Sequence, residues 1–180
     1  MNMDTRFKVL ESLNAGDFQH LNGDLERHLK GTASILESWG ASEVLQTAGL
    51  FHAAYGTAGF DMNMVSLEQR DSIAKTIGKD QEALVYLYCS CDREFVFRQF
   101  GHQDKIQFKD RFNGRFFPLD IHRTKMFCEL TVANELELVY SSEAFKQEHG
   151  KGLYHLFVRM EAYLSHSAIQ AFKVALDSVF

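Results

Sequence analysis

Apolar residues recur every three or four positions along most of this chain, which is the spacing of one face of an α-helix. The stripe between residues 22 and 39 stops at Gly40, and it predicts a helix whose inner face includes one histidine. The positions of this stripe are Leu25, His28, Leu29, Thr32, Ile35, Leu36 and Trp39. The next segment starts at Ser42, a residue type that caps helices, and continues through Phe51 with little polar surface. We expect this segment to lie near the centre of the core.

The same spacing predicts helices over most of the remaining residues. We expect them over residues 4–13, 66–77, 79–100, 118–140 and 142–147, with one or two more between 152 and 179. Residues 106–117 differ, because apolar and polar side chains alternate there on both sides of Asn113-Gly114. Asn-Gly between alternating segments is a strong signal for a β-hairpin. The sequence therefore predicts one small hairpin insert over about residues 105–117.

Together these elements predict an all-α fold, a compact helical bundle that carries a single β-hairpin. The chain has 180 residues, which is the size of one ordinary domain with a substantial core. We find no linker, internal repeat or low-complexity stretch, so we expect residues 1–180 to form a single domain. The 16 phenylalanines predict a core rich in aromatic side chains, and the single proline favours long helices.

The formal net charge of −5 argues against a general affinity for nucleic acids or anionic membrane surfaces. No apolar stretch is long enough to cross a membrane, and the charged N-terminus does not resemble a signal peptide. The three cysteines, Cys89, Cys91 and Cys128, form no regular disulfide or zinc-ligand framework. We therefore expect a cytoplasmic protein in a reducing compartment, and the sequence leaves open whether it forms a homo-oligomer.

The candidate chemistry centres on two histidines. His28 lies on the inner stripe of its predicted helix, and His52 follows the apolar run Ala48-Gly49-Leu50-Phe51. A buried imidazole must either be hydrogen-bonded or bind something. Each ring therefore has two interpretations, as a core histidine that donates to a backbone carbonyl or as part of a binding pocket. Tyr55-Gly56-Thr57 closes this segment, and its tyrosine would either donate to a ligand or only stabilise the turn.

The order of these features resembles the HD-domain superfamily, and the nearest branch is the hydrolase domain of the RelA/SpoT-type guanosine tetraphosphate enzymes. This resemblance covers roughly residues 22–140. It rests on His28, the helix end from Leu36 to Gly40, Ala48 to His52, Ile77-Gly78 with Leu84-Val85, and the segment from Val132 to Glu137. The chain also resembles a group of small HD-like proteins of unknown function through four further motifs. They are His28-Leu29-Lys30-Gly31-Thr32, Trp39-Gly40, Gly49 to Thr57, and Asp92-Arg93.

In working HD-domain enzymes two histidines and two aspartates hold a metal ion, so the resemblance implies one divalent metal here, Mn, Fe or Zn. Its ligands would be His28, His52 and Asn134. Both aspartates are replaced, one by Ala53 and the other by Asn134, and Gly56-Thr57 stands where an acidic pair positions the attacking water. Because Mn²⁺ and Mg²⁺ favour carboxylate oxygens, these replacements predict a weakened metal site.

Further polar and charged residues belong to the expected pocket. Glu137 would share a helical face with Asn134 and would either replace a lost acid, as Glu129 would, or lie on a solvated surface. Arg70 would be a surface charge or an anion contact. Asp92 and Arg93 fall in an apolar segment, where they would form a buried salt bridge or bind the ligand. The expected pocket residues are His28, His52, Tyr55, Thr57, Arg70, Asp92, Arg93, Asn134 and Glu137.

Three functions are compatible with these features. The missing acids favour a binding module with a histidine-lined pocket for a small polar or anionic ligand, such as a nucleotide or another phosphoester. The two histidines support a second function, a metal-dependent phosphohydrolase with a rearranged metal site. In the third, an aromatic surface makes the chain an accessory protein in a larger assembly. The sequence does not decide whether the protein is an enzyme.

Overall fold

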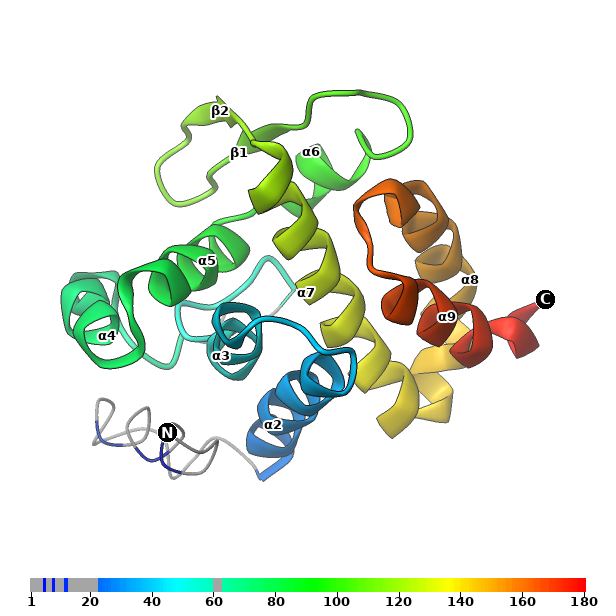
Figure 1. Cartoon of the computed structure of the whole chain (residues 1–180), viewed down its shortest axis with the longest axis horizontal. Coiled ribbons are helices and arrows are strands. Elements are labelled where there is room, and N and C mark those ends of the chain that lie inside the picture. The colour runs from blue at the N-terminus through cyan, green and yellow to red at the C-terminus, as the bar shows by residue number, and fades with distance from the viewer. Residues whose placement is uncertain (1–4, 6–7, 9–11, 13–22, 60–62) are drawn as a thin grey trace.

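Helix α7 (Ile121–Ser141) runs through the middle of the molecule, and the other long helices pack around it (Figure 1). On one side lie α2 (Gly23–Ser38), α3 (Glu43–Phe51) and α5 (Lys79–Cys89), and on the other lie α8 (Glu143–Met160) and α9 (His166–Ala175). The sequence explains this central position, because α7 is apolar around most of its circumference. Its fully buried apolar residues are Phe127, Cys128, Leu130, Val132, Ala133 and Leu136.

The computed structural model describes residues 5, 8, 12, 23–59 and 63–180. Within them the fold is mostly helical with one two-stranded antiparallel hairpin, which confirms the predicted fold class. The helix expected over residues 4–13 lies almost wholly outside the described residues. No helix in the described part of the chain is both long enough and apolar enough to cross a membrane.

The shorter elements flank this helical core. The 3-10 segment η2 (Leu67–Gln69) leads into α4 (Arg70–Ile77), which packs against α5. Helix α6 (Arg93–Phe97) lies with strands β1 (Gln107–Lys109) and β2 (Phe116–Pro118) near the start of α7 (Figure 1). Two more 3-10 segments, η3 (Glu161–Tyr163) and η4 (Asp177–Val179), follow α8 and α9.

Several predicted helix ends are confirmed by their caps. The Ser42 hydroxyl accepts the Leu45 N–H at the start of α3. Ser66 forms a capping box with Gln69 at the start of η2. The predicted stop at Gly78 is also confirmed. Its φ is 107°, a backbone conformation that residues other than glycine rarely adopt.

The expectation of one helix over residues 79–100 is wrong, because α5 ends at Cys89 and α6 begins at Arg93. Asp92 explains the break. Its carboxylate accepts the Phe95 N–H as a new helix cap, and its own N–H donates to the Lys109 carbonyl on the hairpin. An interior helical residue would donate its N–H within the helix, so pairing with the hairpin ends α5.

The tail is more continuous than expected. Helix α8 covers residues 143–160 without interruption, although the sequence predicts a short helix over 142–147 and a separate one after Gly152. Gly150 explains the difference, because a Cβ at this position would lie 2.7 Å from Cγ1 of Val179. Glycine here allows close packing of α8 against the C-terminal segment and does not end the helix.

The predicted hairpin is confirmed, with Phe108 opposite Phe117 and Lys109 opposite Phe116. Its loop is longer than a two-residue Asn-Gly turn and covers residues 110–115. The buried carboxylate of Asp110 organises this loop by accepting the Phe112 N–H at 2.8 Å. It also accepts the hydroxyl of Tyr86 on α5, and so ties the hairpin to the helical core.

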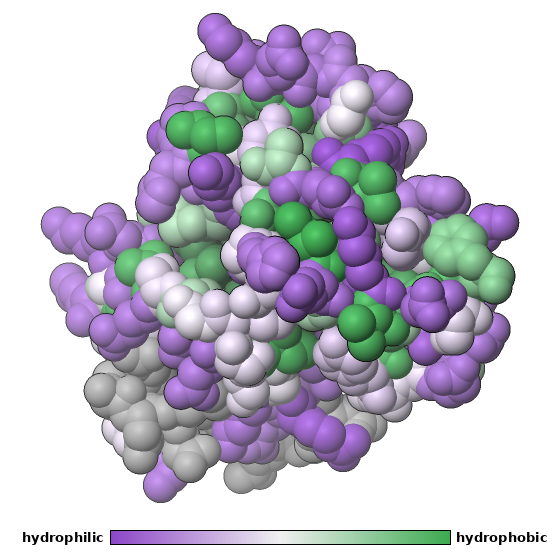
Figure 2. Space-filling view, turned by 45° about the vertical axis from the view of Figure 1, so that its right-hand side comes forward, coloured by the Kyte–Doolittle hydropathy of each residue, from purple (hydrophilic) through white to green (hydrophobic). Residues whose placement is uncertain are grey.

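Among the described residues, the exposed large apolar side chains come from several elements and not from one helical face. On the face shown in Figure 2, apolar patches are small and are divided by polar residues. These exposed residues are Leu67, Phe116, Ile121, Tyr140, Val158, Val174 and Phe180. This distribution does not single out one surface for an accessory role.

Candidate functional site

Three polar side chains from three helices converge inside the molecule. His28 projects from α2, His52 is the C-cap of α3, and Asn134 projects from the middle of α7. Nε2 of His28 lies 3.2 Å from Nε2 of His52 and 2.8 Å from Oδ1 of Asn134. The two ring centroids are 5.0 Å apart and nearly perpendicular. The structure therefore places together the three residues for which the resemblance implies a metal.

Two glycines allow the helices to come this close. A Cβ on Gly49 of α3 would lie 2.7 Å from Cδ1 of Leu36 and 3.3 Å from Cα of Ala33, both on α2. A Cβ on Gly31 of α2 would lie 2.8 Å from Cγ of Glu137 on α7. Since real Cβ atoms essentially never come within 3.0 Å of another residue's heavy atoms, glycine at both positions brings α2 against α3 and α7.

The other nitrogen of each ring is held by an acceptor. Nδ1 of His52 donates to the Gly49 carbonyl at 2.6 Å, and Nδ1 of His28 contacts Oε2 of Glu137. The backbone of His52 is fixed as well, because its carbonyl accepts the Cys89 thiol from α5. Histidines that bind metals typically have their second nitrogen held in this way by a carboxylate or a carbonyl. Both Nε2 atoms are thus oriented toward the same point.

Electrostatics at His52 keep the ring neutral. Burial lowers its pKa from 6.5 to about 3, with further lowering by the nearby His28 and Arg93. With a proton on Nδ1, the Nε2 of His52 carries a lone pair. That lone pair and the amide oxygen of Asn134 both face Nε2 of His28. Such an arrangement of acceptors is stable only with a proton on His28 or a metal cation among them.

A second group of side chains lies directly behind this trio. Oε1 of Glu135 accepts the Asn134 side-chain N–H at 3.0 Å and a guanidinium N–H of Arg93 at 3.3 Å. The Tyr88 hydroxyl accepts another Arg93 N–H at 3.2 Å, and its ring lies edge-on to His52 at 5.7 Å. Burial opposes the charge of Arg93, yet the neighbouring Tyr88 and Glu135 raise its pKa above the ordinary value. Arg93 therefore stays cationic beside the histidines.

Three expected pocket residues make other contacts. The Tyr55 hydroxyl donates to Glu82, and Arg70 forms two hydrogen bonds to the same carboxylate, at 2.6 and 3.0 Å. The Arg70 guanidinium also lies over the Tyr86 ring. Asp92 caps α6 and pairs with Lys109 at 2.6 Å. The structure thus assigns Tyr55, Arg70 and Asp92 to interactions that hold elements together.

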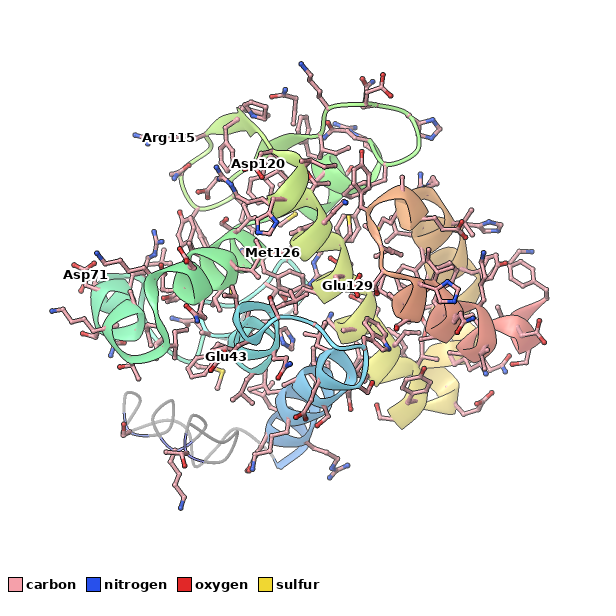
Figure 3. The ribbon with its side chains drawn as sticks, viewed as in Figure 1. Glu43, Asp71, Arg115, Asp120, Met126 and Glu129 are labelled. Carbon is pink, nitrogen blue, oxygen red and sulfur yellow. The ribbon has the colours of Figure 1, made fainter. Side chains whose placement is uncertain are left out.

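The remaining expectations divide in the same way. Glu137 contacts Nδ1 of His28 and belongs to the site, but as a partner of the ring and not as a replacement for a lost acid. Thr57 is buried in the turn that follows His52. Glu129 faces α9, where its carboxylate accepts the backbone N–H and the hydroxyl of Ser165 (Figure 3). Glu129 therefore does not replace a lost acid.

The sequence does not indicate two residues of the site, Tyr88 and Glu135. Tyr88 reads as one more apolar position of α5, and Glu135 as a charge beside Asn134. A weak signal existed for Glu135, because a glutamate on an apolar helix must be paired if it is buried. For Tyr88 the sequence holds no signal that separates it from other core aromatics.

Residues 9–93 match a family described as Domain of unknown function (DUF6817). This stretch contains His28, His52 and Arg93, and it ends before α7, which supplies Asn134, Glu135 and Glu137. No curated protein and no solved structure gives a significant match. The comparisons therefore relate the first half of the chain to this domain and do not assign an HD domain.

The donor set decides whether a metal fits here. No group of three or more histidine, cysteine, aspartate or glutamate side chains in the described part of the chain is placed to hold a metal ion. Any metal at this site would therefore depend on the two imidazoles and the amide oxygen. Donors bonded to one metal at about 2.1 Å lie about 3 Å apart, which agrees with the 3.2 and 2.8 Å between these atoms. Imidazoles suit Zn, Fe and Ni better than Mg, so a metal held by this donor set would be a transition metal.

Proposed function

We propose that the chain binds one divalent transition-metal ion between His28, His52 and Asn134, and binds a small anionic ligand beside it. The observation that supports this most is the orientation of the two rings. Each Nδ1 is held by an acceptor, and Nε2 of His28 lies 3.2 Å from Nε2 of His52 and 2.8 Å from the Asn134 amide oxygen.

The surrounding charges support an anionic ligand. Glu135 and Glu137 contribute two negative charges and Arg93 one positive charge, while His52 is neutral. With His28 also neutral as a ligand, a divalent cation would leave this group with a net charge of about +1. An unbalanced buried charge is costly, so an anion beside the metal would stabilise the site.

His28 is the more exposed of the two histidines. Its side chain is 16% exposed, whereas His52 as a residue is 2% exposed, so a ligand would reach the metal from the His28 side. Three protein donors leave further coordination positions open, which is the arrangement of catalytic metal sites and not of structural ones. This observation favours a second candidate function, the hydrolysis of phosphoesters by a rearranged HD-like site. We rank binding first, because neither carboxylate would be a metal ligand. Glu137 contacts Nδ1 of His28, and Glu135 accepts the Asn134 amide N–H.

Metal titration of protein purified without a histidine tag tests the proposal. We expect one equivalent of Zn²⁺ or Fe²⁺ per chain, weaker binding of Mn²⁺ and no measurable binding of Mg²⁺. His52→Ala removes one donor and should abolish stoichiometric binding. The matched control is His122→Ala, which removes an exposed histidine of α7 and should leave binding unchanged.

The outcomes separate the candidate functions. The proposal is supported if the wild type binds one metal ion per chain, His52→Ala loses it, and inorganic phosphate binds to the metal-loaded protein. If the metal-loaded wild type also hydrolyses a phosphomonoester, and His52→Ala does not, the result supports hydrolysis. A wild-type protein that binds none of these metals contradicts the proposal and leaves a metal-free histidine site.

A further inference from the structure

The orientation of the Asn134 side chain decides whether this site presents an acceptor or a donor. The two ends of an asparagine amide have the same size, but the oxygen accepts hydrogen bonds and the NH2 group donates them. Only the oxygen end can serve as a metal ligand. Hydrogen-bond partners determine which end faces which neighbour. The partners of Asn134 are therefore part of the site.

Glu135 supplies the partner that settles this orientation. Its carboxylate is buried, and Oε1 lies 3.0 Å from Nδ2 of Asn134. An ionised carboxylate only accepts hydrogen bonds, so the NH2 end must face Glu135. The amide oxygen is then left on the opposite side, 2.8 Å from Nε2 of His28. The opposite orientation would put the amide oxygen against the carboxylate.

The contacts of Arg93 keep Glu135 available for this role. Arg70 and Glu82 form a two-point pair at 2.6 and 3.0 Å, which is the strong form of an arginine–carboxylate contact. Arg93 makes only one contact of 3.3 Å to Glu135 and directs another N–H to Tyr88. The guanidinium thus holds the carboxylate in place, and Oε1 is shared with Asn134.

We propose that Glu135 is a positioning residue that directs the amide oxygen of Asn134 toward the histidines. Its relevance to metal binding rests on the proposed function. A neutral side chain can serve at position 134 because the Glu135 carboxylate supplies a negative charge next to the amide, through its hydrogen bond to the Asn134 NH2 group. Asn134 and Glu135 then act as a pair. An aspartate at position 134 would place two carboxylates about 3 Å apart, which repel each other.

Two substitutions and their combination test the pair. Glu135→Gln keeps the size but can present an oxygen or an NH2 group, so it no longer selects one orientation of Asn134. We expect it to weaken Zn²⁺ binding roughly 10-fold, which is typical when a metal ligand loses its hydrogen-bond partner. Asn134→Asp alone should gain no affinity. Combined with Glu135→Gln it should restore at least wild-type affinity, because the glutamine NH2 group can donate to the new carboxylate. Glu94→Gln, at an exposed site on α6, is the control.

A second measurement does not need the metal. In metal-free protein the side-chain NH2 protons of Asn134 donate to a carboxylate, so their NMR signals should be shifted downfield and protected from exchange. Glu135→Gln should remove both properties, and Glu94→Gln should retain them. Unchanged NH2 signals in Glu135→Gln would overturn the inference, as would unchanged Zn²⁺ affinity. If the wild type binds no metal, the proposed function fails, and the NH2 signals alone decide whether Glu135 orients Asn134.

Discussion

His52 shows how a single residue depends on its surroundings at this site. The ring is almost fully buried, donates from Nδ1 to Gly49, and has a pKa lowered by burial to about 3. In the unfolded chain the same histidine takes up a proton near pH 6.5. Below that pH the unfolded state therefore binds more protons than the folded state. The folded state loses stability as the pH falls.

This linkage predicts an acid-sensitive fold. The contribution of His52 is fully present above about pH 6.5 and falls by about 1.4 kcal/mol for each pH unit below it, toward about pH 3. Urea denaturation of metal-free protein in EDTA, between about pH 5 and pH 7, measures the slope. His52→Gln should reduce the slope by about one proton, because the other titrating groups remain. Equal slopes in the two proteins would contradict this prediction, because they would show that His52 takes up its proton in the folded state over the same pH range as in the unfolded state.

Gly31 is the residue that lets Glu137 reach His28. Gly31→Ala would place a Cβ 2.8 Å from Cγ of Glu137, so that carboxylate must move away from the ring. We expect metal affinity to fall about 10-fold, as it does when an outer hydrogen bond to a ligand histidine is lost. Isothermal titration with Zn²⁺ measures the change.

Gly152→Ala provides the control for this substitution. Gly152 is also a helical glycine, but a Cβ there would meet no atom within 4 Å. Alanine at this position should stabilise the protein by about 0.5–1 kcal/mol through helix propensity and leave metal affinity unchanged. An equal loss of affinity in both variants would show that the effect of Gly31→Ala is not local.

At the scale of elements, the hairpin depends on one buried carboxylate. Asp110 accepts hydrogen bonds from the Tyr86 hydroxyl on α5 and from the Phe112 N–H in the loop. Asp110→Ala should therefore cost about 2 kcal/mol or more, because two partly buried donors lose their acceptor. Asp120→Ala removes an exposed cap of α7 and should cost about 1 kcal/mol. Thermal unfolding compares the two, and a smaller loss for Asp110→Ala would contradict the assigned role.

Local sequence patterns predict most helix ends in this protein, but they fail where contacts with distant segments determine whether a helix ends or continues. Ser42, Ser66 and Gly78 mark helix ends through their own chemistry, so they are visible in the sequence. The break at Asp92 depends on pairing with Lys109 across the hairpin, and the continuity of α8 depends on Val179 beside Gly150. Neither contact is local in sequence. Periodicity alone therefore predicts one helix over residues 79–100 and two separate helices where α8 is continuous.

The same distinction applies to the candidate site. The resemblance to HD-domain enzymes implies His28, His52 and Asn134 as a set, and the structure brings these three residues together. The neighbours that hold them were harder to predict. Arg70 and Arg93 each pair with a glutamate, yet only the partner of Arg93 contacts Asn134. Which arginine lies at the site depends on tertiary packing, and residue type does not reveal it.

At the scale of the whole molecule, the site joins α2, α3 and α7. A metal between them would stabilise only the folded state, by about 2.7 kcal/mol at a free concentration of about 100 times its dissociation constant. For a chain of this size we expect the melting temperature to rise by about 5–10 °C with Zn²⁺. Differential scanning calorimetry should show this rise in the wild type and not in His52→Ala. A rise of the same size in both proteins would place the bound metal elsewhere.

The most direct test of the central claim is a crystal structure of tag-free protein soaked in Zn²⁺, with anomalous diffraction recorded at the zinc edge. We predict one strong anomalous peak about 2.1 Å from Nε2 of His28 and from Nε2 of His52, with the Asn134 oxygen facing it. A map without a peak between these rings, with the two Nε2 atoms still in direct contact, would contradict the account.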